Sequence, residues 1–64
     1  MRAKTQAFNG RQLDTATIEK TKEFFGVHRS REIWPDFRGI LRYDPNCVSI
    51  RINSDRVIQS VWLD

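Results

Sequence analysis

A chain of 64 residues with 11 lysines and arginines against 8 acidic residues has room for one small domain and carries a net charge of +3. Such a chain buries only about 60% of the surface that its unfolded form exposes, so we expect a single domain of marginal stability over 1–64. The lone cysteine excludes an intramolecular disulfide, the first residues lack the apolar core of a secretory signal, and no stretch reaches the roughly 20 apolar residues of a membrane-spanning helix. We therefore expect a cytoplasmic protein without a membrane partner.

The beginning of the chain contains the clearest local signals. Residues 1–12 are basic and polar, and we expect them to form a basic arm or an edge strand. The segment 13–26 follows, in which Asp14 is a typical N-cap whose charge suits the positive end of the helix dipole. Gly26 stands where a left-handed C-cap ends a helix. These signals predict a helix over 15–25.

The segment 27–36 is predicted to connect this helix to the strands. His28, Arg29 and Arg31 follow the helix C-terminus, where positive charge is favourable and bare carbonyl groups need donors. This structural role accounts for all three residues. The alternative is that Arg29 and Arg31 form a rim that grips phosphate groups beside the sheet.

After Pro35 the apolar pattern alternates with a period of two. It predicts strands over 37–43, 47–53 and 56–63, joined by the turns Asp44-Pro45-Asn46 and Asn53-Ser54-Asp55. The whole segment 37–63 is then a three-stranded meander. The predicted fold class is α+β: one short helix packed on a three- to four-stranded antiparallel sheet, in the order β-α-β-β-β.

The two turns predict the register of the meander. With Tyr43 opposite Val48 and Ile52 opposite Val57, one face becomes apolar and is expected to lie under the helix. Its apolar members are Phe37, Leu41, Tyr43, Val48, Ile50, Ile52, Val57, Val61 and Leu63. The opposite face is predicted to hold arginines beside small and apolar side chains: Arg38, Ile40, Arg42, Cys47, Ser49, Arg51, Arg56, Ile58, Ser60 and Trp62.

This outer face favours a small non-enzymatic binding module, and nucleic acid, either RNA or DNA, is the first partner that we expect. Arginines contact phosphates, and an exposed tryptophan stacks on unpaired bases. The candidate binding residues are Arg38, Arg42, Arg51, Arg56 and Trp62, with Arg29 and Arg31 on the rim.

Two other functions compete with this one. The same Trp, Arg and Ile side chains, or an exposed edge strand, would suit a protein partner, as in a small inhibitor, a regulator or a homodimer. The other is a metal-free ribonuclease, in which His28, Arg31, Glu32 and Tyr43 would share acid–base and phosphate-holding roles. That layout resembles the short helix on a curled sheet of some small ribonuclease toxins. No catalytic, cofactor or metal motif is present, so we expect no cofactor, no metal and no enzyme activity.

Overall fold

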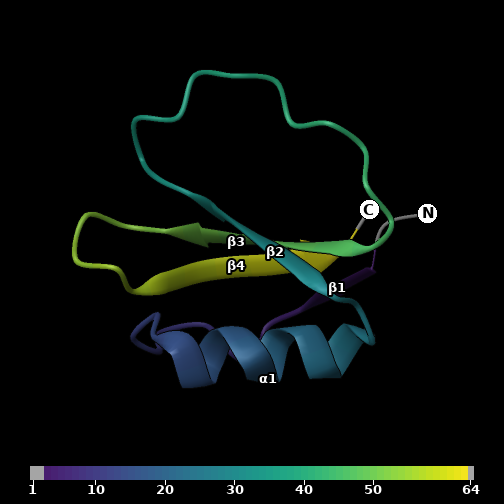
Figure 1. The fold of residues 1–64 in the computed structure, drawn as a ribbon. Helices are drawn as coiled ribbons and strands as arrows, with labels where there is room; N and C mark the ends of the chain where they lie inside the picture. Colours follow the sequence, from purple (N-terminus) through teal and green to yellow (C-terminus); the bar gives the residue numbers. More distant parts are fainter. Residues whose placement is uncertain (1–2, 64) are drawn as a thin grey trace.

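The structure of the protein, a computed structural model, describes residues 3–63. A sheet lies in the middle, with the helix against one face and a long loop arching over the other (Figure 1). The elements, in chain order, are β1 (Ala3–Thr5), α1 (Thr15–Phe25), β2 (Arg29–Ile33), β3 (Cys47–Ile52) and β4 (Ile58–Leu63). The α+β class and the β-α-β-β-β order are thus confirmed.

The helix α1 has the predicted bounds, because both of its ends are specified locally. The side chain of Asp14 accepts a hydrogen bond from the backbone N–H of Thr17 at 2.8 Å, which satisfies one of the free donors of the first turn. At the other end Gly26 has φ 67°, and its N–H donates to the carbonyl group of Glu23. Few residues other than glycine adopt that conformation without strain.

The helix covers a compact apolar core on one face of the sheet. Ile50 and Val61, in the two central strands, are fully buried there. Seven buried side chains form this core: Phe8, Leu13, Val48, Ile50, Ile52, Ile58 and Val61. Phe25 and Val27, at the end of the helix, pack against it. Of the nine apolar residues predicted for this face, four belong to the core, Val48, Ile50, Ile52 and Val61, whereas Phe37, Leu41, Tyr43, Val57 and Leu63 do not.

The sheet has four strands in the order β1-β4-β3-β2, and one of its pairings is parallel. Strand β4 pairs antiparallel with both β1 and β3, whereas β2 and β3 run parallel. The predicted strand over 37–43 is wrong, since no strand forms there and Ile40 is 93% exposed. The strand that pairs with β3 in its place is β2, which lies within 27–36, the segment predicted to be a connection. The segment 37–43 has the alternating pattern of a strand, yet the polar segment Arg29–Ile33 occupies the edge of β3, so local alternation does not decide which segment pairs there.

The parallel pair explains why a long loop crosses the sheet. The chain passes from β1 to β2 through the helix on one face, and returns from β2 to β3 through residues 34–46 on the other (Figure 1). These two passages run in opposite directions across the sheet. Connections between parallel strands are almost always right-handed. Two right-handed connections that run in opposite directions must lie on opposite faces of the sheet, so the loop crosses the face opposite the helix.

The β3–β4 hairpin differs from its predicted register along its whole length, by one residue beside the turn and by two residues beyond it. Ile52 pairs with Ile58 instead of Val57, and a second shift, between Arg51 and Ile52, makes Ile50 pair with Val61 instead of Gln59. The one-residue difference beside the turn comes from the turn itself, in which Arg56 has φ 62° and follows a tight turn that begins at Asn53. A left-handed residue after such a turn produces a bulge. The bulge turns Ile58 into the core, where it is 1% exposed, and not onto the outer face as predicted.

Candidate nucleic-acid interface

The outer face of the sheet is built from aligned side chains. One row crosses all four strands: the backbone pairings align Lys4 with Trp62, Trp62 with Ser49, and Ser49 with Arg31. Trp62, which was predicted to be an exposed stacking platform, is only 7% exposed, and Ser49 is buried beside it. Trp62 therefore has little surface to offer a base.

The loop over 34–46 is what covers this face. Ile33, Cys47 and Trp62 are buried, yet they do not belong to the core under the helix. Leu41, from the middle of the loop, lines a cavity together with Trp62. The sheet is thus buried on both sides, by the helix and by a loop without regular structure. The predicted flat, wet arginine face does not exist.

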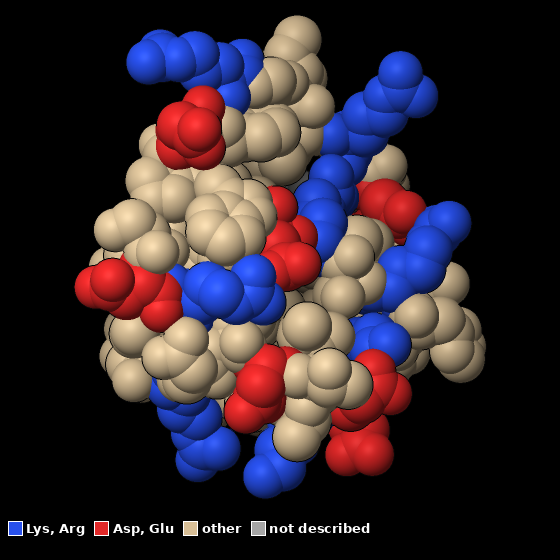
Figure 2. All heavy atoms as spheres, turned by 60° about the vertical axis from the view of Figure 1, so that its left-hand side comes forward, with Lys and Arg blue, Asp and Glu red and all other residues tan. Residues whose placement is uncertain are grey.

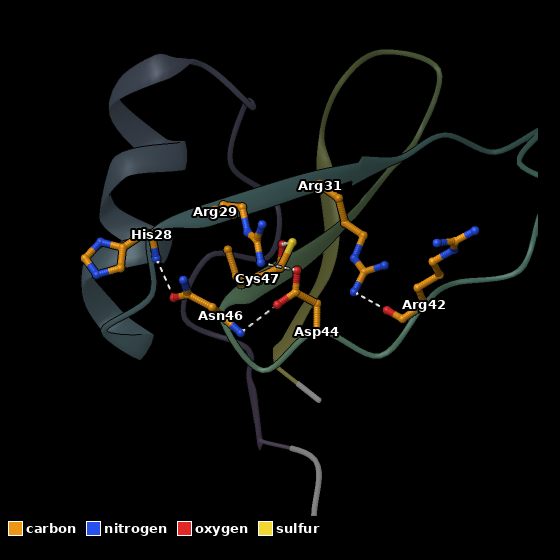
Figure 3. Close-up of polar contacts among 8 residues, drawn as sticks. His28, Arg29, Arg31, Arg42, Asp44, Asn46 and Cys47 are labelled. Atoms are coloured by element: carbon orange, nitrogen blue, oxygen red, sulfur yellow. Dashed lines mark hydrogen bonds and ion pairs between the residues drawn. The ribbon is translucent and has the colours of Figure 1, made fainter.

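Polar contacts hold the loop to the sheet at its end nearest β3 (Figure 3). The guanidinium of Arg29 forms an ion pair with Asp44 at 2.6 Å, and Arg31 Nη2 donates to the carbonyl oxygen of Arg42 at 2.7 Å. The side-chain oxygen of Asn46 accepts from the backbone N–H of His28 at 3.0 Å. Both predicted rim arginines therefore hold the loop, as side chains of a structural anchor.

Asp44 stands at the centre of this anchor. The backbone N–H of Asn46 donates to one carboxylate oxygen at 3.0 Å, and Arg29 binds the other. The N–H group of Asn46, and then the Arg29 guanidinium, hold the pKa of Asp44 below its ordinary value. Hydrogen bonds and a nearby cation both favour the ionised form. The anchor is therefore charged at neutral pH.

The loop carries most of the large apolar side chains that are exposed among the described residues. Five large apolar side chains are exposed among residues 3–63, and four of them belong to a single ten-residue segment of the loop, 34–43: Trp34, Phe37, Ile40 and Tyr43. Arg38 and Arg42, also exposed, lie between them. We name this set, Trp34, Phe37, Arg38, Ile40, Arg42 and Tyr43, the loop surface. The prediction had assigned its Phe37 and Tyr43 to the core.

The remaining two candidate arginines lie apart from each other. Arg51 is exposed on the outer face, with its guanidinium carbon 6.0 Å from the centre of the Trp62 ring. Arg56 lies at the hairpin turn, 5.4 Å from the Trp34 ring and in an ion pair with Glu32 at 3.2 Å. Arg51 lies on the face of the sheet that the loop covers, whereas Arg56 lies at the hairpin end of the sheet and contacts Glu32 and Trp34 there.

The charge of the protein is concentrated on the side of the loop. Among residues 3–63, six basic residues belong to the loop or the outer face, against only Asp36 and Asp44: Lys4, Arg29, Arg31, Arg38, Arg42 and Arg51. Elsewhere the two signs are mixed. Figure 2, in which the hairpin end of Figure 1 comes forward, shows basic and acidic side chains interspersed without a broad patch of either.

The residues of the ribonuclease hypothesis do not converge. Arg31 and Glu32 are neighbours in an extended strand, so their side chains project to opposite faces of the sheet. Arg31 holds the loop, while Glu32 pairs with Arg56. Within residues 3–63, no group of three or more His, Cys, Asp or Glu side chains is arranged to hold a metal ion.

Comparisons with protein-family models, with curated proteins and with solved structures found no match. None of the helices among the described residues is long and apolar enough to cross a membrane.

Proposed function

We propose that this protein binds single-stranded nucleic acid, and that the loop surface makes the contacts. The observation that carries this proposal is the exposure of three aromatic rings, those of Trp34, Phe37 and Tyr43, within one ten-residue segment that also holds two exposed arginines. Exposed rings beside cations are the means by which single strands are bound without a sequence code: the rings stack on bases and the cations contact phosphates.

The two arginines of the loop surface are available for such contacts. Neither Arg38 nor Arg42 forms an ion pair with any residue in 3–63. This distinguishes them from Arg29 and Arg56, whose charges are already paired. A free guanidinium can engage a phosphate without first breaking an internal contact.

The large apolar side chains of the loop surface remain exposed in the folded protein, and this supports a role in binding. A connection of this length without regular structure is uncommon in a small domain unless it has a function. The Arg29–Asp44 pair and the Arg31 hydrogen bond hold its C-terminal half in place. A loop that is ordered in advance loses less entropy when it binds.

Fluorescence anisotropy tests the proposal. A labelled single strand of roughly 12 nucleotides, as RNA and as DNA, is compared with a duplex of equal length at several salt concentrations. We expect the single strands to bind more tightly, because the bases of a duplex are stacked on one another. In Arg38→Gln and in Arg42→Gln, the magnitude of the slope of log K against log salt should decrease by about 0.7, because each variant loses one phosphate contact.

Aromatic variants and a control separate stacking from charge. Phe37→Ala and Tyr43→Ala should each weaken binding by about 1–3 kcal/mol without changing the salt slope, since one base loses its stacking partner. Lys20→Gln removes the same charge from an exposed position on the helix and should leave the affinity nearly unchanged. Equal binding of duplex and single strands, or equal losses in Lys20→Gln and Arg38→Gln, would refute the role of the loop surface.

A second candidate function rests on one residue, Ile40. Its side chain is 93% exposed, and it has no aromatic ring that could stack on a base. An exposed apolar side chain between arginines is typical of protein interfaces. The partner that this candidate names is a second copy of the chain. Light scattering over a range of concentrations should then show a dimer that Ile40→Asp dissociates, whereas a monomer at all concentrations rejects it.

A further inference from the structure

A cavity of about 310 Å³ lies between the loop and the outer face of the sheet. Trp62 and Ser60, both on β4, form its base, and Leu41 of the loop lies over them. Lys4 on β1 and Arg51 on β3 line its two sides. The volume is at the lower end of the roughly 300–1,000 Å³ that small-molecule sites span.

The lining of the cavity has the chemistry of an anion site. Among the described residues, the lining contains two cations and a hydroxyl group, and no carboxylate. Neither Lys4 nor Arg51 forms an ion pair with any residue of the described part. Their strands flank β4 on either side, which places the two backbones about 10 Å apart, at twice the spacing of neighbouring strands. Both side chains are long enough to reach one anion from opposite sides.

The rest of the lining is apolar, which narrows the class of anion. Leu41 and the Trp62 ring supply apolar surface, and the Arg51 guanidinium lies 6.0 Å from the centre of that ring. An inorganic ion would leave this surface unused. A ligand with a phosphate at one end and a flat, partly apolar ring at the other would use all of it.

We propose that this cavity binds a nucleoside monophosphate, with its phosphate between Lys4 and Arg51 and its base against Leu41. The inference rests on the proposed function, which it deepens: the ligand in a bound strand is one terminal nucleotide, while the exposed loop surface contacts the nucleotides that follow. Leu41 faces the cavity from the same segment that carries those exposed rings.

Tryptophan fluorescence reports on the cavity directly. The variant Trp34→Phe keeps a ring at 34 and leaves Trp62 as the sole tryptophan of the chain. Titration of this protein with uridine and adenosine monophosphates should change the Trp62 emission with saturation. Uridine and inorganic phosphate serve as the two partial ligands, and each should bind at least tenfold more weakly than the complete nucleotide.

Charge variants in the Trp34→Phe background locate the phosphate. Lys4→Gln and Arg51→Gln should each weaken nucleotide binding by tenfold or more, because each removes a charge-assisted hydrogen bond. Lys20→Gln, on the exposed side of the helix, should not weaken it. Failure of either nucleotide to bind at millimolar concentration overturns the inference. So does binding that survives in both Lys4→Gln and Arg51→Gln, or inorganic phosphate that binds as tightly as the nucleotides.

The two proposals fail separately. Arg38→Gln combined with Arg42→Gln should abolish most of the affinity for the labelled strand while leaving nucleotide binding in the cavity intact. A protein that binds strands but not mononucleotides contradicts the cavity site alone. A protein that binds mononucleotides but not strands contradicts the loop surface as a strand-binding site, and also the assignment of the cavity to a strand terminus.

Discussion

Truncation of Ile58 to alanine should remove a large part of the stability of this domain. Its side chain is 1% exposed and belongs to the core under the helix. Replacement of a buried isoleucine by alanine costs about 2–5 kcal/mol, because transfer free energy is lost and a cavity remains. At about 0.05–0.15 kcal/mol per residue, a chain of 64 residues has a free energy of unfolding of about 3–10 kcal/mol.

Urea denaturation followed by tryptophan fluorescence measures this loss. With a urea dependence near 1 kcal/mol per molar, typical of a small domain, the midpoint should fall by about 2 M or more. Ile58→Val gives a measurable loss of about 0.5–1.5 kcal/mol if the alanine variant does not fold. Val57→Ala is the matched control, since its half-buried side chain lies outside the core cluster and should cost less than Ile58→Ala.

One result would refute the reasoning about the hairpin. If Val57→Ala costs more than Ile58→Ala while Ile58→Val changes nothing, Val57 is the residue that faces the helix. The hairpin would then have the register predicted from its pattern, without the bulge that follows Arg56.

Two further predictions concern the ends of elements. Gly26→Ala should destabilise the protein by about 1 kcal/mol in the same urea assay, because the left-handed conformation at φ 67° is unfavourable for alanine. The cause is the backbone conformation alone, since an added Cβ would meet no atom within 4 Å. An unchanged urea midpoint would show that the helix does not end in this conformation. Asp44→Asn should lower the stability at pH 7 and flatten its decline in acid. The pKa of Asp44 is lower in the folded than in the unfolded protein, so its contribution is present above the ordinary value of 3.8 and lost as the pH falls through the folded value. Parallel curves of stability against pH for wild type and variant between pH 5 and pH 2 would contradict this, because the two proteins differ in no carboxylate other than that of Asp44.

The amino-acid sequence by itself determined the elements whose signals lie within a few residues. The helix has both predicted ends, because Asp14 and Gly26 act on their own backbone neighbours. Strands β3 and β4 lie within their predicted ranges, and the alternation of Val48, Ile50 and Ile52 placed the correct face of β3 against the helix. These choices need no information about distant parts of the chain.

The loop surface was not predictable in the same way, although one signal was present. The segment 34–43 has the alternation of a strand, but Asp36 and Gly39 within it are turn-forming residues that argue against a continuous one. These two residues indicate a loop in place of a strand, and a loop at this position leaves Phe37 and Tyr43 outside the core.

The tertiary structure alone decided which segment pairs with the free edge of β3. Arg29–Ile33 is polar and short, and nothing local marks it as a strand; it becomes one because its backbone groups find partners along β3. That parallel pairing forces residues 34–46 across the outer face, buries Trp62, and leaves a cavity between Leu41 and the sheet. Partners separated by many residues are chosen by the free energy of the whole assembly, and a pattern read a few residues at a time does not contain that choice.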